Sequence, residues 1–413
     1  MMYNKFLLLF REKDPSIVDN NKVHSSLRNY MPIFHLLLCS VVIFFVLYAP
    51  QPMLAQFAEY FAITPAKAGL LMTVTMLPLA VAPIFYGLVL TRFCKLIVLR
   101  NTMIALALCC TVIGLTGQFE LFLTMRFIEG LLLPAALTSM TGYIGQTWQG
   151  QCLRKNMTWY VGSTIAGGYL GRALAANFAT WWGFESFYLF NAFLLLMLAL
   201  VIKPAYKKTT TQPPLTSPKA YLKPLKSAKL LRLYGAVFCM FYCFSALLNY
   251  LPFILSNEYQ IKDPKLIAWV YSGYLVGALI SMVTPLLSKL THNNWQILTT
   301  LFAIYSMTLL AMQWNSLSLF VAMFTLFCAC MFMIHASAAP LANELSTANA
   351  SITNGAYVSF YYCGGALGTF VPGFIYQIYG LAIFLLSLLF VCIFGGYLVM
   401  QNQRTGSETQ CGV

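Results

Sequence analysis

Residues 167–190 read GGYLGRALAANFATWWGFESFYLF, and residues 364–387 read GGALGTFVPGFIYQIYGLAIFLLS. The two stretches share identical residues at a constant offset of 197 positions. The matches are Gly167, Gly168, Leu170, Gly171 and Gly183 with Gly364, Gly365, Leu367, Gly368 and Gly380. Pro52 and Pro252 repeat at nearly the same interval, which is 200 positions. A repeat with so long a period predicts two similar halves.

The composition of the chain is that of a membrane protein. Of its 413 residues, 60% are hydrophobic and 9% are charged, whereas about a quarter of the residues in soluble domains are charged. Apolar runs of about 20 residues recur, which is the length that a helix needs to cross a bilayer. We therefore predict an all-α polytopic membrane protein with twelve transmembrane helices in two six-helix pseudo-symmetric halves. The expected helices are 32–55, 66–90, 96–117, 120–145, 157–180, 184–203, 231–255, 267–289, 295–313, 316–340, 354–376 and 380–401.

The spans and the repeat divide the chain into five parts. We expect a cytoplasmic N-terminal tail at 1–31, a six-helix bundle at 32–203, a cytoplasmic linker at 204–230, a second bundle at 231–401 and a cytoplasmic tail at 402–413. The linker is rich in lysine, proline and threonine, which is typical of a flexible connection. A polybasic regulatory segment is the alternative interpretation.

The basic residues predict the orientation. With both termini in the cytoplasm, 20 of the 25 Lys and Arg residues lie on that side and three on the other. The net charge of +14 is therefore a feature of topology. It suits the anionic lipid of the cytoplasmic face and does not indicate nucleic-acid binding.

Charged residues inside the spans are the candidates for function, because such residues usually line a pathway. Arg126 and Glu129 are three residues apart on one helix and share a face. Glu129 could carry a proton, with Arg126 and Arg172 nearby, or it could form a static pair with Arg126. Arg172 leaves a net charge of +1, which suits an anionic substrate. His335 is a further candidate for proton transfer.

Several other kinds of chemistry have no motif in this sequence. The 12 cysteines have no metal-ligand spacing, so we expect no metal site. No phosphate-binding Gly-Lys-Ser/Thr motif and no catalytic constellation is present. We therefore expect neither an enzyme nor a cofactor, and we expect an ion gradient as the source of energy.

Three motifs resemble those of the major facilitator superfamily, and above all its bacterial sugar-efflux and drug:proton antiporter permeases. They are YAPQPMLAQFAEYFAITPAKAGLLMTVTMLPLA at 48–80, MRFIEGLLLPA at 125–135 and YVGSTIAGGYLGR at 160–172. The resemblance covers roughly residues 32–401. It implies a monomeric carrier of a small molecule in the bacterial inner membrane, with a binding site between the halves.

The resemblance also assigns residues. The first and seventh helices line the cavity in this superfamily, which implies substrate contacts from Tyr48, Gln51, Asn249 and Tyr250, and Tyr361 lies on an aromatic face of the eleventh helix. Glycines with a packing or gating role are Gly130, Gly167, Gly171, Gly364 and Gly368. The loop motif after the second helix keeps Gly87 and Arg92 but has Thr91 and Cys94 in place of Asp and Gly.

These observations predict a secondary active transporter, namely a proton-coupled exporter of small amphipathic or anionic solutes that works by alternating access. One alternative is an importer of a small metabolite such as an organic acid. Another is a receptor or assembly factor that has the same fold but transports nothing.

Overall fold

The computed structural model describes residues 31–89, 93–203, 226–284, 293–314, 316–346 and 350–408. Within these ranges the chain is helical apart from short connections and has no β-strand. Residues 1–30 and 409–413 of the two tails, most of the linker and Arg92 lie outside the described residues.

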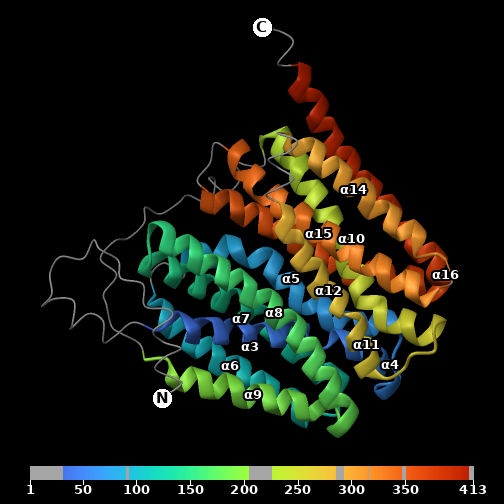
Figure 1. Ribbon diagram of the computed structural model, residues 1–413. Coiled ribbons are helices and arrows are strands. Elements are labelled where there is room, and N and C mark those ends of the chain that lie inside the picture. Colours follow the sequence, from blue (N-terminus) through green and yellow to red (C-terminus); the bar gives the residue numbers. More distant parts are fainter. Residues whose placement is uncertain are drawn as a thin grey trace, which may run out of the picture.

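The helices form two groups that follow the order of the sequence (Figure 1). The first contains α3 (Ile33–Tyr48), η2 (Gln51–Met53), α4 (Leu54–Tyr60), α5 (Pro65–Val89), α6 (Lys95–Leu115), α7 (Phe119–Thr147), α8 (Gly150–Trp182) and α9 (Phe184–Val201). The second contains α10 (Ala228–Glu258), α11 (Pro264–Val270), α12 (Ser272–Ile280), η6 (Ser281–Val283), α14 (Asn294–Ala311), α15 (Leu317–Leu345) and α16 (Ala350–Glu408). We refer to these groups as the N-half and the C-half.

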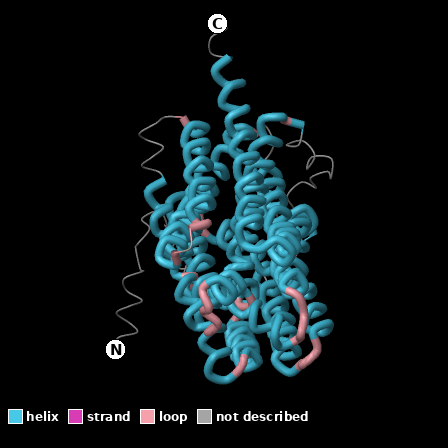
Figure 2. The backbone as a smooth tube through the Cα atoms, turned by 90° about the vertical axis from the view of Figure 1, so that its right-hand side faces the viewer, coloured by secondary structure: helices cyan, strands magenta, loops and turns pink. Residues whose placement is uncertain are grey.

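Nine helical segments of the described ranges are long and apolar enough to cross a membrane. The helices run side by side with short connections at their ends (Figure 2). The last segment, Ile352–Gln403, is interrupted by non-helical backbone at Gly380. The prediction of an all-α multi-pass membrane fold is thus confirmed, and the number of twelve spans stays a prediction.

The expected first helix at 32–55 is wrong as a continuous α-helix. α3 ends at Tyr48, and a 3₁₀ turn, η2, separates it from α4. Pro50 has no N–H group, so it cannot donate the helical hydrogen bond to the carbonyl of Val46. The proline break therefore leaves carbonyl groups without a partner in the last turn of α3.

Two glycines of the repeat have the same unusual backbone conformation. Gly183 has φ +83° and separates α8 from α9, and Gly380 has φ +73° and divides α16. A positive φ is favourable for glycine because it has no Cβ. Equivalent residues of the two halves therefore make equivalent turns.

Glycines of the repeat also allow helices to approach closely. A Cβ on Gly171 would lie 2.8 Å from Cα of Phe45 in α3, and a Cβ on Gly368 would collide with the carbonyl oxygen of Tyr242 in α10. Similar close contacts are made by Gly167 with α3, Gly364 with α10 and Gly130 with α5. The glycine stripes thus position α8 on α3 and α16 on α10, which places Arg172 beside the end of α3. A role of these glycines in gating stays a prediction.

Side-chain hydrogen bonds between described residues join the halves. The hydroxyl oxygens of Thr73 in α5 and Thr369 in α16 are 2.8 Å apart, and the Thr180 hydroxyl donates to the Asp263 carboxylate at 3.1 Å. Next to the threonine pair, a Cβ on Gly69 would be 2.7 Å from the Thr369 carbonyl oxygen. α5 and α16 are therefore in direct contact across the boundary between the halves.

Candidate functional site

Arg172 lies in the middle of α8 and is 1% exposed. Its Nε donates to Oε1 of Gln51 at 2.7 Å, and its Nη1 donates to the carbonyl of Gly168 at 2.7 Å. Gln51 reaches the guanidinium because it begins the 3₁₀ turn where the first helix breaks. The break and the glycine stripe of α8 together make space for this buried cation.

Three tyrosine rings surround the Arg172 guanidinium. Its central carbon lies 4.3 Å from the ring centroid of Tyr48, 4.7 Å from that of Tyr274 and 5.4 Å from that of Tyr271. Such distances allow cation–π attraction. Tyr48 belongs to the N-half, whereas Tyr271 and Tyr274 belong to the C-half, so the cation bridges the two halves. We call Arg172, Gln51 and these three tyrosines the arginine–tyrosine site.

The charge of Arg172 is not neutralised within the described part of the chain. No carboxylate there forms a salt bridge with it, and its Nη2 atom makes no hydrogen bond to a described residue. A buried charge without a counter-ion is unfavourable, so natural proteins almost always pair such charges. The arginine–tyrosine site therefore has the capacity for an anion.

Arg126 and Glu129 form a second buried cluster, inside α7. Nη1 of Arg126 is 2.6 Å from Oε2 of Glu129, and both side chains are fully buried. The guanidinium also donates to the backbone carbonyls of Val46 at 2.6 Å, Leu47 at 3.1 Å and Leu71 at 3.1 Å. Arg126 thus satisfies carbonyls that the proline break leaves open in the last turn of α3.

The two arginines belong to separate clusters. Oε1 of Glu129 accepts from the thiol of Cys110 in α6, at 3.5 Å, so every described partner of the pair belongs to the N-half. Among the described residues, no hydrogen bond or salt bridge connects Arg172 with Arg126 or Glu129. Both clusters nevertheless contact the end of α3, Arg126 at the carbonyls of Val46 and Leu47 and Arg172 at the ring of Tyr48.

Asn249 and Tyr250 are used in helix packing in this conformation. The amide of Asn249 donates to the carbonyl of Thr369 at 3.0 Å, and the hydroxyl of Tyr250 donates to the same oxygen at 3.1 Å. Both side chains are fully buried. Thr369 is the repeat counterpart of Arg172, so the two halves place different chemistry at the same position. Contact of Asn249 and Tyr250 with substrate stays a prediction.

His335 and Tyr361 lie together in the C-half. Nδ1 of His335 is 2.9 Å from the hydroxyl oxygen of Tyr357, and its ring centroid is 5.1 Å from that of Tyr361. Tyr361 also stacks on Phe241 with centroids 3.6 Å apart. The structure thus brings together two residues that the sequence assigned to separate roles, one in proton transfer and one in substrate contact.

Residues 36–369 match the family model of the Major Facilitator Superfamily. The chain belongs to this superfamily. It is 24% identical over 388 residues to an uncharacterized transporter of Buchnera aphidicola subsp. Baizongia pistaciae (strain Bp), which covers 90% of this chain and 96% of that protein. It is 22% identical to the uncharacterized MFS-type transporter YybF of Bacillus subtilis (strain 168), over 80% and 84% of the two chains.

Solved structures show the same fold. A bacterial homologue of the human lysosomal transporter Spinster, in an inward-facing and occupied conformation, superposes with a TM-score of 0.70 and 12% identity. The match covers 90% of this chain and 96% of the solved one, and the unoccupied inward-facing form matches equally well. The protein is thus a multi-pass membrane transporter for a small molecule, as its superfamily implies.

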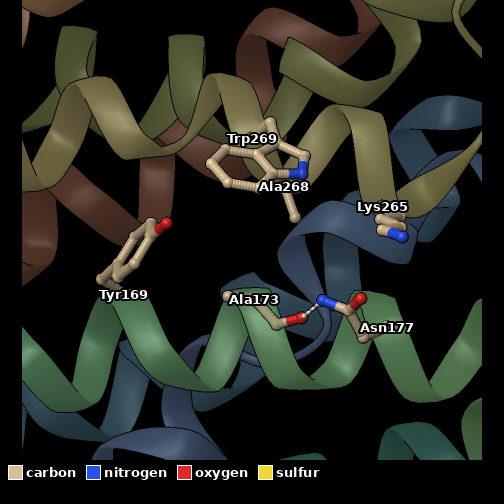
Figure 3. Close-up of a pocket in the computed structure, with 6 residues that line it drawn as sticks. All are labelled: Tyr169, Ala173, Asn177, Lys265, Ala268 and Trp269. Atoms are coloured by element: carbon tan, nitrogen blue, oxygen red, sulfur yellow. Dashed lines mark hydrogen bonds between the residues drawn. The ribbon is translucent and has the colours of Figure 1, made fainter.

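A small cavity of the transporter lies between α8 and α11 (Figure 3). It has a volume of about 110 Å³ and is lined by Tyr169, Ala173, Asn177, Lys265, Ala268 and Trp269. The amide of Asn177 donates to the carbonyl of Ala173, so this polar group is satisfied within α8. Binding sites for drug-sized molecules range from about 300 to 1,000 Å³, so this cavity alone is too small for such a substrate.

The sequence prediction missed two residues of the site, Tyr271 and Tyr274. They lie three positions apart in the segment YSGY, so a single helix can direct both rings to one side. That spacing was the available signal, although tyrosines in apolar helices more often serve in packing. Of the loop motif, Gly87 lies near the end of α5, and Arg92 is outside the described residues.

Proposed function

We propose that this transporter is a proton-coupled exporter of small amphipathic or anionic solutes. The observation that supports this most directly is Arg172, a buried cation without a carboxylate partner among the described residues, at the boundary between the halves. In alternating access a site between the halves is exposed to each side of the membrane in turn. A cation at this boundary can bind an anion from one side and release it to the other.

The charge balance favours a substrate with a negative group. Arg126 and Glu129 are 2.6 Å apart, and their opposite charges neutralise each other. Of the charges in the two clusters, the positive charge of Arg172 therefore remains. Bringing an anion to Arg172 would neutralise it. The aromatic surroundings, which include Tyr48, suit an amphipathic body on the same molecule.

We assign proton coupling to Glu129, with Arg126 as its partner. A proton on Glu129 would end the ion pair, yet three backbone carbonyls would still hold Arg126 in place. The pair can therefore exist in two protonation states without leaving the guanidinium unsupported. His335 and Tyr357 form a second candidate group for proton transfer, in the C-half.

The direction and setting of transport follow from the resemblance and the sequence pattern. Residues 48–80 resemble bacterial efflux permeases, which supports export across the inner membrane by a monomer. The Lys and Arg bias supports cytoplasmic termini and contact with anionic lipid on that face.

The test uses purified protein in vesicles with an imposed pH gradient and a panel of labelled organic acids, amides and amines of matched size. We expect acids to move against the proton flow in a protein-dependent manner. Glu129→Gln should lose this gradient-driven flux, whereas Glu120→Gln, an exposed carboxylate near the start of α7, should retain it. Unchanged proton-driven flux in Glu129→Gln would eliminate Glu129 as the carrier. Flux that is independent of the pH gradient, or flux in the same direction as the protons, would overturn the proposed function.

A further inference from the structure

The arginine–tyrosine site continues into an aromatic cluster of the C-half. The ring of Tyr274 lies 5.0 Å from that of Phe332 and 6.2 Å from that of Phe244, centroid to centroid. The Phe244 and Phe332 rings are 6.1 Å apart. Phe244 is buried, whereas Phe332 is only partly buried, so Phe332 offers the aromatic surface of this cluster.

The hydrogen bonds of Arg172 determine which edge of the guanidinium is available. Nε is held by Gln51, and one Nη1 hydrogen is held by the Gly168 carbonyl. Tyr274 adds its ring face, and its hydroxyl group also interacts with the guanidinium. Nη2 remains without a hydrogen-bond acceptor among the described residues. A planar carboxylate fits such an edge, because guanidinium N–H groups lie in one plane and donate to two oxygens in parallel.

The faces of the tyrosine rings interact only weakly with this edge of the guanidinium. A ring face attracts a cation but accepts no strong hydrogen bond, whereas a carboxylate supplies both a charge and two acceptors. Two of the three rings, those of Tyr271 and Tyr274, belong to the C-half and would withdraw from the guanidinium when the halves separate. A carboxylate can then take their place.

We propose that the arginine–tyrosine site binds one carboxylate group, and that the flat apolar body of the same molecule lies on Phe332. The substrate class is an amphipathic monocarboxylate. This inference rests on the proposed transport of anionic solutes and adds the number and kind of charged groups. One cation compensates one carboxylate, so a second carboxylate on the ligand would have no partner in the described part of the site.

The experiment measures binding to the full-length protein in detergent, without any gradient. The probes are 2-naphthoate, 2-naphthamide and 2,6-naphthalenedicarboxylate, which share one flat body and differ in charge. We expect 2-naphthoate to bind about tenfold more tightly than the amide, as one charge-assisted hydrogen bond implies, and the dicarboxylate to bind no more tightly than 2-naphthoate. Equal binding of acid and amide, or much tighter binding of the dicarboxylate, would overturn the inference.

Variants locate the effect. Arg172→Gln should abolish the preference for acid over amide, and Arg172→Lys should retain part of it, because Lys keeps the charge but not the planar fork. Lys265→Gln removes a nearby cation of the cavity between α8 and α11 and should leave the preference unchanged. A preference that survives Arg172→Gln, or that disappears in Lys265→Gln, would refute the assignment. If Arg172→Gln does not fold, binding of the three probes to the wild-type protein and to Arg172→Lys still tests the assignment.

Failure of this inference differs from failure of the proposed function. Binding without a gradient does not depend on proton coupling or on the direction of transport. Proton-driven flux of organic acids without any acid preference in binding would refute the carboxylate site alone. An acid preference in binding without proton-driven flux would refute the proposed function alone.

Discussion

The buried pair of Arg126 and Glu129 should respond very differently to neutralisation of its two members. In Arg126→Gln the carboxylate of Glu129 keeps the thiol of Cys110 as a donor, at 3.5 Å, and loses its cation. The carbonyls of Val46, Leu47 and Leu71 lose their donor as well. In Glu129→Gln the arginine keeps all three carbonyls and an amide oxygen in place of the carboxylate.

These contacts determine how much the two single variants should differ in their free energy of unfolding. Leaving one member of a buried ion pair uncompensated typically destabilises a protein by about 3–5 kcal/mol, and we expect Arg126→Gln at the upper end because three carbonyls are orphaned in addition. For Glu129→Gln we expect about 1.5–3 kcal/mol, which is the value of one hydrogen bond to a charged group. The double variant Arg126→Gln/Glu129→Gln should be more stable than Arg126→Gln alone, because the buried charge disappears.

The assay is SDS-induced unfolding of the purified protein in mixed micelles, followed by circular dichroism for the two single variants and the double variant. A double-mutant cycle gives the coupling energy of the pair directly. Equal losses for the two single variants would contradict the reasoning, since they would mean that the carbonyls of α3 and α5 do not support Arg126. A double variant less stable than Arg126→Gln would contradict it as well.

Three further predictions concern the helix contacts. Thr73→Cys/Thr369→Cys should form a disulfide, because the two hydroxyl oxygens are 2.8 Å apart. This cross-link should stop transport until a reductant is added, and each single variant is the control. Full activity of the cross-linked protein would mean that α5 and α16 do not separate during transport. Gly380→Ala should destabilise by about 1–3 kcal/mol, because its φ of +73° and ψ of −171° lie in a region that is essentially confined to glycine. Gly162→Ala, with open space around it in α8, should instead stabilise by about 0.5–1 kcal/mol. Equal unfolding midpoints for these two variants would refute this prediction. Gly368→Ala should destabilise by about 1–3 kcal/mol, since its Cβ would meet the backbone of α10, and a wild-type midpoint would show that the helices move apart freely.

The architecture was accessible from the sequence because its signals are local or repeated. Gly183 and Gly380 match at the repeat offset and share a positive φ, so the repeat in the sequence corresponds to a repeated turn in the structure. The i, i+3 spacing of Arg126 and Glu129 predicted that they share a helix face, and in the structure they form an ion pair. The break after Tyr48 was missed, although Pro50 within an apolar run was its visible signal.

The partners of the buried arginines could not be predicted in the same way. The carbonyl of Val46 is 80 positions from Arg126 and becomes an acceptor only because the helix breaks after it. Tyr271 lies between α11 and α12 and Tyr274 lies in α12, in an apolar segment of the other half where an aromatic residue is usually a packing residue. Only the packing of α11 and α12 against α8 brings their rings to Arg172.

The two arginines show why a count of charges inside the spans is incomplete. Arg126 and Arg172 are equally buried and lie in the same half, so the sequence gives them equal weight. The groups around them differ. Arg126 has a carboxylate and three carbonyls. Arg172 has one amide oxygen, one carbonyl of its own helix, the hydroxyl of Tyr274 and three ring faces, and no carboxylate among the described residues. A guanidinium whose nitrogens all donate to oxygen acceptors is fixed, and one whose Nη2 faces no acceptor among the described residues can take an anion there. The repeat supports the same conclusion. Thr369, the C-half counterpart of Arg172, carries no charge, and its hydroxyl group is hydrogen-bonded to that of Thr73.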